Sequence, residues 1–584
     1  MAVKHALGYQ NYEKMMDNNI FYIDKTDFIR EWWDYADEVT LITRPRRFGK
    51  TLNMSTVECF FSEKYKEKSY LFEGKKVWED EEMRKLQGQF PVIFMSFARA
   101  KSGYDRATDE KTKLDSINAM KTAVKQIITD TYAKYEDIME SELFSIKDRA
   151  YFASVRDDMD DKTAQTAVRR LCFYLEKYYK KKVLILLDEY DTPMQEAWLY
   201  GYWDRAVGFF RSFFVSTFKD NEYMERGLIT GITRISMSRF ASHRESIFSE
   251  LNHLKVVTTT SDKYALSFGF TEQEVFDALD DAGFGSEKET VKQWYDGFIF
   301  GKYTDIYNPW SIIAFLENDA KYEPYWANTS ANSLVSSLIQ RGNKAVKRTV
   351  EDLLAGKSFR AQIDEQIVFS QLEGNMDAVW SLLLATGYLK TLGTEYVGEK
   401  KRCIYTLGLT NMEVSIMFED MVRGWFAGDS VRAAYNAFVE SLLMNDVESM
   451  NEFMNKIALH SFSSFDTAKG VSDDDAPERF YHGFVLGLVV ELAGRFEIRS
   501  NRESGFGRYD VMLIPADADK DDAYIIEFKV HKPRREKNLE QTLANALLQI
   551  EEKKYEAELV SRGFAPEKIR RYGFVFKGKE CLIG

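Results

Sequence analysis

Three polar residues near the end of the chain have the types and spacing of a divalent-cation site. Asp510 precedes the apolar segment Val511–Pro515, and Glu527 and Lys529 lie within residues 525–530. We expect these segments to pair as a hairpin that places Asp510 opposite the Glu527 end of its partner. Because side chains alternate along a strand, Glu527 and Lys529 share one face. Carboxylate oxygens suit Mg²⁺ or Mn²⁺, and a lysine can orient water or balance phosphate charge, so the pattern predicts a metal-dependent phosphodiesterase centre.

The alternative for the same residues is a surface hairpin whose acids and lysine face water. An Asp and a Glu-x-Lys at this separation arise often by chance. Phe528 and Val530, which are available for burial beside Glu527 and Lys529, favour a cleft over a fully solvated face.

A second group of residues has the composition of a phosphate-binding loop. Residues 43–52 lie between a predicted strand and a predicted helix and contain Gly49, Lys50 and Thr51. Backbone N–H groups of such a turn bind phosphates at the helix N-terminus. Lys50 would neutralise the β- and γ-phosphates, and the Thr51 hydroxyl would hold Mg²⁺. The usual first glycine of this pattern is replaced by Arg44.

The other residues expected to bind the nucleotide lie in the same loop and after the next two strands. Arg46 and Arg47 are loop candidates. The strand predicted at residues 183–187 ends in Asp188 and Glu189, which a nucleotide-hydrolysing site needs on a neighbouring strand. Asp188 would bind Mg²⁺ through water, and Glu189 would polarise the attacking water.

Thr233 and Arg234, at the end of the following strand, are candidate γ-phosphate sensors. The alternative for the acidic pair is an ordinary end of a buried strand. The order of strand, Gly-Lys-Thr, helix, strand and Asp-Glu favours nucleotide binding over that alternative.

The composition bounds the class of protein. The chain has 584 residues, 45% hydrophobic and 29% charged, with a net charge of −13, which excludes a disordered chain and restricts any nucleic-acid-binding surface to a local patch. Four widely separated cysteines without a Cys-x-x-Cys pair argue against a zinc ribbon or a disulfide scaffold. There is no secretory signal and no apolar run long enough for a bilayer, so we expect a cytoplasmic protein without membrane contact.

The pattern along the chain predicts an α/β protein of three domains. Strands alternate with helices over residues 1–265, which predicts a parallel, doubly wound sheet. Residues 266–460 are mainly helical, and the order helix, hairpin, helix between Trp380 and Met417 suits a winged-helix-like module. Residues 461–475 are the expected linker. Residues 476–584 should form a helix, a strand-rich stretch and another helix that ends the chain.

The N-terminal motifs resemble those of a known family. Tyr22-Ile-Asp-Lys-Thr26, Arg44-Pro-Arg-Arg-Phe-Gly-Lys-Thr-Leu52 and Leu187-Asp-Glu-Tyr-Asp-Thr-Pro193 are similar to the AAA-ATPase-like domain of many bacterial proteins. The resemblance covers roughly residues 4–260, and the Arg-Pro-Arg-Arg run in place of the first glycine is usual in that family. It implies a P-loop NTPase-like fold that binds ATP.

The C-terminal motifs resemble the PD-(D/E)XK nuclease superfamily. They are Phe480-Tyr-His-Gly-Phe484, Ser500-Asn-Arg-Glu-Ser-Gly505, Gly507-Arg-Tyr-Asp510, Ile526-Glu-Phe-Lys529 and Gln549-Ile-Glu-Glu-Lys-Lys-Tyr555, with Tyr509 in place of the motif's proline.

This resemblance covers about residues 476–584 and implies a restriction-endonuclease-like α/β domain. Asp510 and Glu527 would be metal ligands, Lys529 the catalytic lysine and Gln549 a supporting polar residue. The superfamily also has an acid on its first helix, for which Glu478 and Glu491 both remain candidates.

Together these patterns predict an ATP-binding protein with an Mg²⁺- or Mn²⁺-dependent nuclease domain. The expected substrate is nucleic acid, DNA rather than RNA, cleaved under nucleotide control; an oligomer is compatible with this. The alternative is a nucleotide-dependent nucleic-acid-binding or signalling ATPase that does not cleave. A ring-forming remodelling ATPase is a third, weaker reading because no arginine-finger position stands out.

Overall fold

The computed structural model folds the chain into two compact units. The N-terminal unit comprises Met1–Thr329 and Arg360–Glu413, and the C-terminal unit comprises Ser330–Phe359 and Val414–Gly584. The chain thus enters the C-terminal unit twice, and the three-domain division stays a prediction. The residues that the structure describes are 4–101, 109–219, 221–234, 247–248, 250–326, 333–342, 344–364, 372, 375–424, 429–465, 484, 487–488, 490–492, 494–500, 503–504, 507–508, 510–533 and 535–584.

A parallel five-stranded sheet forms the centre of the N-terminal unit. Its order is β2 (Val92–Ser96), β3 (Val183–Asp188), β4 (Met224–Gly231), β1 (Val39–Thr43) and β5 (Leu254–Val257). Every residue of β1 and β3 is buried, as expected for parallel strands that are covered on both faces. The predicted doubly wound P-loop NTPase-like sheet is confirmed, whereas β2 and β5 were not anticipated.

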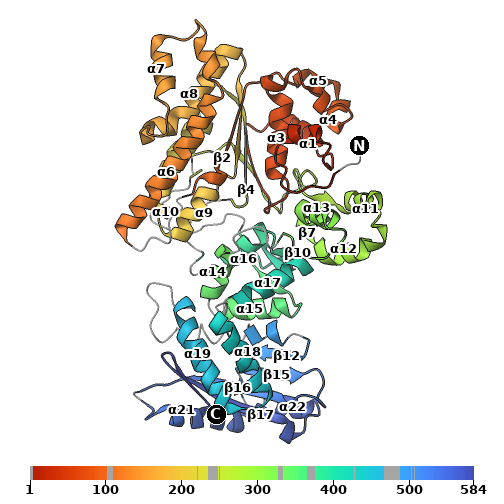
Figure 1. Ribbon diagram of the computed structural model, residues 1–584, viewed down its shortest axis with the longest axis vertical. Coiled ribbons are helices and arrows are strands. Elements are labelled where there is room, and N and C mark those ends of the chain that lie inside the picture. Colours follow the sequence, from red (N-terminus) through yellow and green to blue (C-terminus); the bar gives the residue numbers. More distant parts are fainter. Residues whose placement is uncertain are drawn as a thin grey trace. The chain divides into compact units, whose positions relative to one another are not determined.

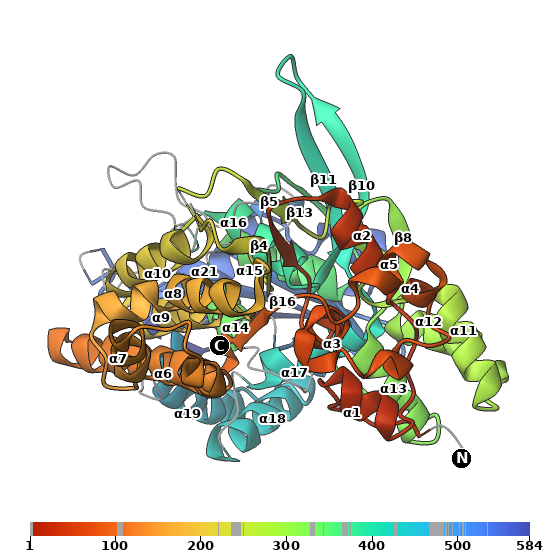
Figure 2. The same cartoon turned by 90° about the horizontal axis from the view of Figure 1, so that it is seen from above.

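Helices cover both faces of this sheet (Figure 1). One face carries α1 (Tyr12–Asp17), α2 (Asp27–Tyr35), α3 (Lys50–Phe61), α4 (Lys76–Glu79) and α5 (Glu81–Leu86), of which α2 is labelled in Figure 2. The other carries α6 (Glu110–Ala133), α7 (Ile146–Ser154), α8 (Asp161–Tyr179), α9 (Thr192–Tyr200) and α10 (Trp203–Phe218). An aromatic-rich core that includes Trp32, Phe60 and Phe61 packs α1–α3 onto the sheet.

The rest of the N-terminal unit is mainly helical with two small sheets. It contains α11 (Glu272–Asp281), α12 (Lys288–Tyr295), α13 (Pro309–Glu317) and α16 (Met376–Ala385), with β6 (Phe270–Thr271), β7 (Phe298–Phe300) and β8 (Tyr303–Tyr307). The expected hairpin is present as β10 (Leu389–Val397) and β11 (Arg402–Leu409), with β9 (Phe359–Ala361) beside β11. Figure 2 shows the hairpin extending from the helices of this unit.

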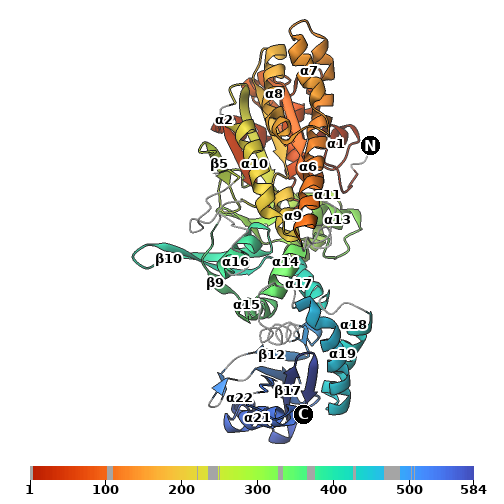
Figure 3. The same ribbon diagram turned by 90° about the vertical axis from the view of Figure 1, so that its left-hand side faces the viewer.

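The C-terminal unit is built on a mixed five-stranded sheet. Its order is β12 (Phe496–Ser500), β15 (Val511–Pro515), β16 (Ala523–Val530), β17 (Ile569–Lys577) and β18 (Glu580–Ile583). The predicted β15–β16 hairpin is confirmed, and β17 runs parallel to β16. Helices α18 (Asp429–Leu443), α19 (Val447–Phe465), α21 (Leu539–Glu552) and α22 (Ala557–Ser561) lie beside this sheet (Figure 3). The unit also contains α14 (Ser333–Arg341), α15 (Lys344–Leu354), α17 (Met412–Gly424) and a small pair of strands, β13 (Glu503–Ser504) and β14 (Gly507–Arg508).

Two expectations for this unit are wrong. The linker cannot begin at residue 461, because α19 continues to Phe465; residues 466–475 lie outside the described part. The chain ends in strands β17 and β18, not in a helix. The pairing of β17 with β16 joins strands separated by α21, so it was not readable from local pattern.

Helix α19 protects the outer edge of β18 with asparagine side chains. The Asn451 side chain donates a hydrogen bond to the carbonyl oxygen of Ile583 and accepts one from its N–H, both at 2.8 Å. Asn455 makes the same pair of hydrogen bonds with Cys581, also at 2.8 Å. Residues four apart on a helix and two apart on a strand have similar spacing, so the two amides replace a missing neighbouring strand. An edge that is covered in this way does not pair with other chains.

No helix in the described part of the chain is both long and apolar enough to cross a membrane.

Candidate functional site

The loop between β1 and α3 has the backbone geometry of a phosphate-binding turn. Arg47 and Gly49 have φ of 65° and 76°, in the left-handed region that a tight turn requires. Among the described residues, no carbonyl accepts a hydrogen bond from the N–H groups of Arg46 to Leu52. Unsatisfied N–H groups ahead of a helix N-terminus favour an anion, so the loop fits the phosphates of a nucleotide.

Lys50 is buried, and its ammonium points back to the loop. Its Nζ donates to the carbonyl oxygens of Arg44 at 3.0 Å and Pro45 at 2.6 Å. Burial lowers the pKa of Lys50 to about 8, and the carboxylates of Glu189 and Asp188 oppose that shift. A phosphate would offer the ammonium a charged acceptor in place of two neutral ones.

Asp188, at the end of β3, lies close to Thr51 of α3, although β3 is not adjacent to β1, the strand that precedes the loop and α3. The sequence led us to expect Asp188 on a strand next to β1. Strand β4 lies between β1 and β3, so this expectation is wrong. Thr51 Oγ1 donates to Asp188 Oδ2 at 2.7 Å, and Thr230 Oγ1, from β4, donates to Oδ1 at 2.6 Å. Burial raises the pKa of Asp188. A hydroxyl beside a carboxylate is an oxygen pair suited to Mg²⁺.

Asp191 is a site residue that sequence reasoning missed. It is 1% exposed, and its Oδ2 accepts from the N–H groups of Ile232 and Thr233, from Thr233 Oγ1 and from Gln195 Nε2, at 2.7–3.0 Å. Thr233, an expected phosphate sensor, is therefore held by a carboxylate. The second aspartate of Leu187-Asp-Glu-Tyr-Asp-Thr-Pro193 was the available signal.

Glu189 occupies a strained backbone position next to the cations of the loop. Its φ is 49°, and its Oε2 accepts from Thr192 Oγ1 at 3.1 Å. Burial lowers the pKa of Arg47, and the charge of Glu189 opposes this shift. The Arg47 guanidinium stacks over the Trp310 ring, 4.0 Å from its centroid.

Arg44, at the position of the usual glycine, supports the loop from inside. Its guanidinium is fully buried and donates to the carbonyl oxygens of Thr43, Thr258, Lys263 and Tyr264. It also lies 4.7 Å from the centroid of Phe300. The arginine thus ties the end of β1 to the segment after β5.

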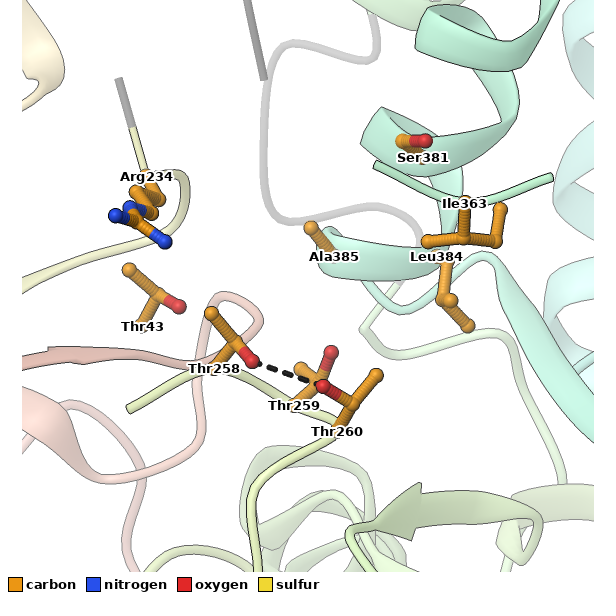
Figure 4. Close-up of a pocket in the computed structure, with 9 residues that line it drawn as sticks. All are labelled: Thr43, Arg234, Thr258, Thr259, Thr260, Ile363, Ser381, Leu384 and Ala385. Carbon is orange, nitrogen blue, oxygen red and sulfur yellow. Dashed lines mark hydrogen bonds between the residues drawn. The ribbon is translucent and has the colours of Figure 1, made fainter. Parts of the chain in front are cut away.

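The Arg46 carbonyl joins the loop to residues far away in the sequence. It accepts from Trp326 Nε1 at 3.1 Å and from Asn308 Nδ2 at 3.3 Å. Arg234 lines a small pocket with Thr43, residues 258–260 and part of α16; Figure 4 shows its guanidinium beside Thr43.

The C-terminal residues are brought together as expected. Val511 pairs with Ile526, so Asp510 lies at the level of Glu527, and Asp510 Oδ2 accepts from the N–H of Phe528 at 2.8 Å. Lys529 Nζ donates to Glu527 Oε1 at 3.1 Å.

Gln549 of α21 bridges the acid and the lysine. Its Nε2 donates to Glu527 Oε1 and, at 3.0 Å, to Tyr555 Oη, while its Oε1 accepts from Lys529 Nζ. These contacts fix the amide orientation and hold the Glu527 carboxylate from the helix side.

The Glu527 carboxylate retains a buried acceptor. Oε2 has no hydrogen-bond partner among the described residues, and the side chain is 3% exposed. Burial, and then the nearby charge of Asp510, raise the pKa of Glu527 to about 7. A cation would satisfy this oxygen and remove the repulsion between the two acids, so the donor set fits Mg²⁺ or Mn²⁺.

The third acid is not placed. Glu478 lies outside the described residues. Glu491 forms an ion pair with Arg423, with 3.2 Å between Glu491 Oε1 and Arg423 Nε. In the described part of the chain, no group of three or more His, Cys, Asp or Glu side chains is arranged to hold a metal.

Glu351 of α15 supports this centre from a distant part of the chain. It is 7% exposed and accepts from both the N–H and the hydroxyl of Ser500. Ser500 pairs with Val511, the residue after Asp510. A separation of 149 residues between Glu351 and Ser500 left no local signal for this contact.

Comparisons with known proteins agree with this geometry. Residues 6–240 match a family model described as "Predicted AAA-ATPase", and residues 476–584 match that of the PD-(D/E)XK nuclease superfamily. The chain therefore carries an AAA-ATPase-like domain at its N-terminus and a PD-(D/E)XK nuclease superfamily domain at its C-terminus. It is a nucleotide-binding protein with a nuclease-superfamily domain.

No curated protein matches the chain. A solved structure, the Walker-type ATPase PABY2304 of Pyrococcus abyssi, is similar at 11% identity, with 69% of this chain and 96% of that chain covered and a TM-score of 0.32, which is too low to support an argument.

Replacing Lys50 by alanine should weaken ATP binding by about tenfold to a hundredfold, because a hydrogen bond to a charged group contributes roughly 1.5–3 kcal/mol. Isothermal titration calorimetry with Mg·ATP measures this. Lys64→Ala, at an exposed position just beyond α3, is the matched control and should bind normally. An unchanged affinity of Lys50→Ala would contradict the assigned loop.

Manganese affinity should rise about tenfold between pH 6 and pH 8. A carboxyl with a pKa near 7 is mostly protonated at pH 6 and mostly ionised at pH 8, and only the ionised form binds the cation. Electron paramagnetic resonance of free Mn²⁺ without nucleotide reports the affinity. Glu527→Gln should lose most of the binding and its pH dependence, whereas Glu540→Gln, exposed on α21, should keep both. Equal wild-type affinity at both pH values would contradict the raised pKa.

Proposed function

We propose that this protein binds and hydrolyses ATP and that its C-terminal domain uses Mg²⁺ or Mn²⁺ to cleave phosphodiester bonds of nucleic acid, DNA in preference to RNA. The observation that carries the nuclease half is the joined set of Asp510, Glu527, Lys529 and Gln549. A descendant that only binds nucleic acid has no need to keep two acids and a lysine at neighbouring positions of this hairpin.

The residues of the C-terminal centre have separate tasks in this proposal. Asp510 and Glu527 would hold the cation, which would supply Lewis-acid charge beside the scissile phosphate. Lys529 would hold the attacking water or balance the charge of the phosphate in the transition state. Gln549 keeps the lysine and Glu527 in register.

The N-terminal centre has the parts that ATP requires. The N–H groups of the loop and Lys50 would bind phosphates, and Thr51 and Asp188 would hold Mg²⁺. Glu189 would orient the attacking water, and Thr233 and Arg234 would sense the γ-phosphate from the end of β4.

Nucleotide control is supported by the contacts of the phosphate-binding loop. The Arg46 carbonyl accepts a hydrogen bond from Trp326 Nε1. Gly387 lies so close to the loop that a Cβ atom added to it would be 3.0 Å from the Pro45 side chain. The loop therefore packs closely against residues outside the sheet. A shift of the loop on ATP binding would therefore displace the helix–hairpin segment that starts at α16.

A nucleotide-dependent binding or signalling ATPase without cleavage is the second candidate. It is favoured by the centre having two carboxylates, not three, within the described residues.

Cleavage assays with single- and double-stranded DNA and RNA separate these candidates. Mg²⁺ or Mn²⁺ should support cleavage, DNA should be preferred, and ATP should change the rate. Lys529→Ala should lower the rate by about 10²–10³-fold and leave ATP binding intact, because removing one charge-stabilising donor commonly costs that much. The matched control is Lys520→Ala, at an exposed position in the β15–β16 loop.

Cleavage by Lys529→Ala at the wild-type rate would refute the assigned centre. Binding without cleavage by the wild-type chain would favour the second candidate.

A further inference from the structure

The β10–β11 hairpin exposes an unusually large part of its side chains. All residues of β10 from Leu392 to Val397 are exposed, including Tyr396 at 72%, Leu392 at 55% and Val397 at 45%. A strand that packs one face on a core alternates between buried and exposed residues. The outer half of β10 is instead open on both faces, while residues 403–406 of β11 are half-buried. Figure 2 shows the hairpin extending from the N-terminal unit. An exposed pair of strands with large side chains marks an interaction surface.

The tip of the hairpin is an ordered, positively charged turn. Lys401 N–H donates to Gly398 O at 3.0 Å, and both residues have positive φ, of 45° and 73°. Lys400, Lys401 and Arg402 follow one another, and within the described residues none of the three forms an ion pair. The turn also contains one acid, Glu399, so three adjacent cations outweigh one carboxylate there. In a chain of net charge −13, such a local excess of positive charge is complementary to a polyanion.

The strand register places an exposed aromatic side chain next to the tip of the hairpin. Tyr396 pairs with Cys403, and Thr394 pairs with Tyr405, so the two tyrosines lie on the same face of the hairpin. Val397 pairs with Arg402 at the tip, so the Arg402 side chain lies on the opposite face of the hairpin from Tyr396. Surfaces that bind single-stranded nucleic acid usually combine cations, which contact the phosphates, with exposed aromatic rings, on which bases stack.

We infer that this hairpin binds single-stranded nucleic acid, with phosphates on Lys400, Lys401 and Arg402 and a base on Tyr396. The inference rests on the proposed function in that nucleic acid is the substrate, but it names a surface outside both sites. A second copy of the chain is a poorer occupant. Strand β10 is an edge strand, but its irregular register at Thr391 and Gly393 and its charged Glu395 oppose regular strand pairing.

Fluorescence anisotropy with a labelled 20-nucleotide single-stranded DNA tests the surface in the full chain. All proteins carry Lys529→Ala so that the probe is not cut. Changing Lys400, Lys401 and Arg402 together to alanine should weaken binding at least about tenfold. It should also reduce the slope of log K against log salt by about two, since each phosphate contact on a single strand contributes roughly 0.7.

Substitutions at Tyr396 test the stacking contact separately. Tyr396→Ala should weaken binding about fivefold to tenfold with little change in salt slope, while Tyr396→Phe, which keeps the ring, should bind like the parent. Equal loss in both variants would overturn the stacking part.

The matched control for the tip is a second basic triplet of the same unit. Lys180, Lys181 and Lys182 are consecutive and exposed, and their replacement by alanine should leave affinity and salt slope unchanged. Circular dichroism and ATP calorimetry on every variant confirm that the fold is intact.

The outcomes separate this inference from the proposed function. If the parent chain binds no nucleic acid, both fail. If the parent binds and the tip variant binds with the same affinity and salt slope, only the hairpin inference is overturned. A tip variant that changes the sedimentation coefficient but not DNA affinity would make the hairpin a self-association surface and would also overturn it.

Discussion

Both sites depend on buried carboxylates, at the end of β3 (Asp188), at the start of α9 (Asp191) and within β16 (Glu527). Asp188 and Asp191 are each 1% exposed and Glu527 is 2% exposed. Removing an ionised carboxylate from water is costly unless donors or cations replace the lost hydration. The positions of the neighbouring strands and helices are therefore constrained by the donors that these three acids require.

The two units meet this requirement differently. In the N-terminal unit the donors are neutral: Thr51 and Thr230 bond Asp188, and backbone N–H groups with a hydroxyl bond Asp191. The end of β4 is thereby fixed to the loop after β3. In the C-terminal unit one donor is a cation: Glu527 Oε1 accepts from the Lys529 ammonium and from Gln549. One carboxylate oxygen in each unit, Asp191 Oδ1 and Glu527 Oε2, has no partner among the described residues.

The chain also connects distant segments to support each site. Arg44 fixes the base of the phosphate-binding loop to the segment after β5 through carbonyl oxygens, where a glycine would leave the loop without that support. Glu351 joins α15 to Ser500, beside the strand that follows Asp510. Cleavage and nucleotide binding would thus both depend on residues that touch neither ligand.

Local pattern determined much of this protein. The apolar runs predicted β1 and β15 with their full bounds and β3 to within one residue. The alternation of side chains along β16 placed Glu527 and Lys529 on one face. Both features could be predicted because they depend only on neighbours in the sequence. The insertion of β4 between β1 and β3, the terminal strand β17, and the contacts of Asp191 and Glu351 were decided only by tertiary structure. Each depends on pairing between segments that are far apart, and such pairing is selected by the burial and hydrogen bonding of the whole fold, which no short stretch of sequence specifies.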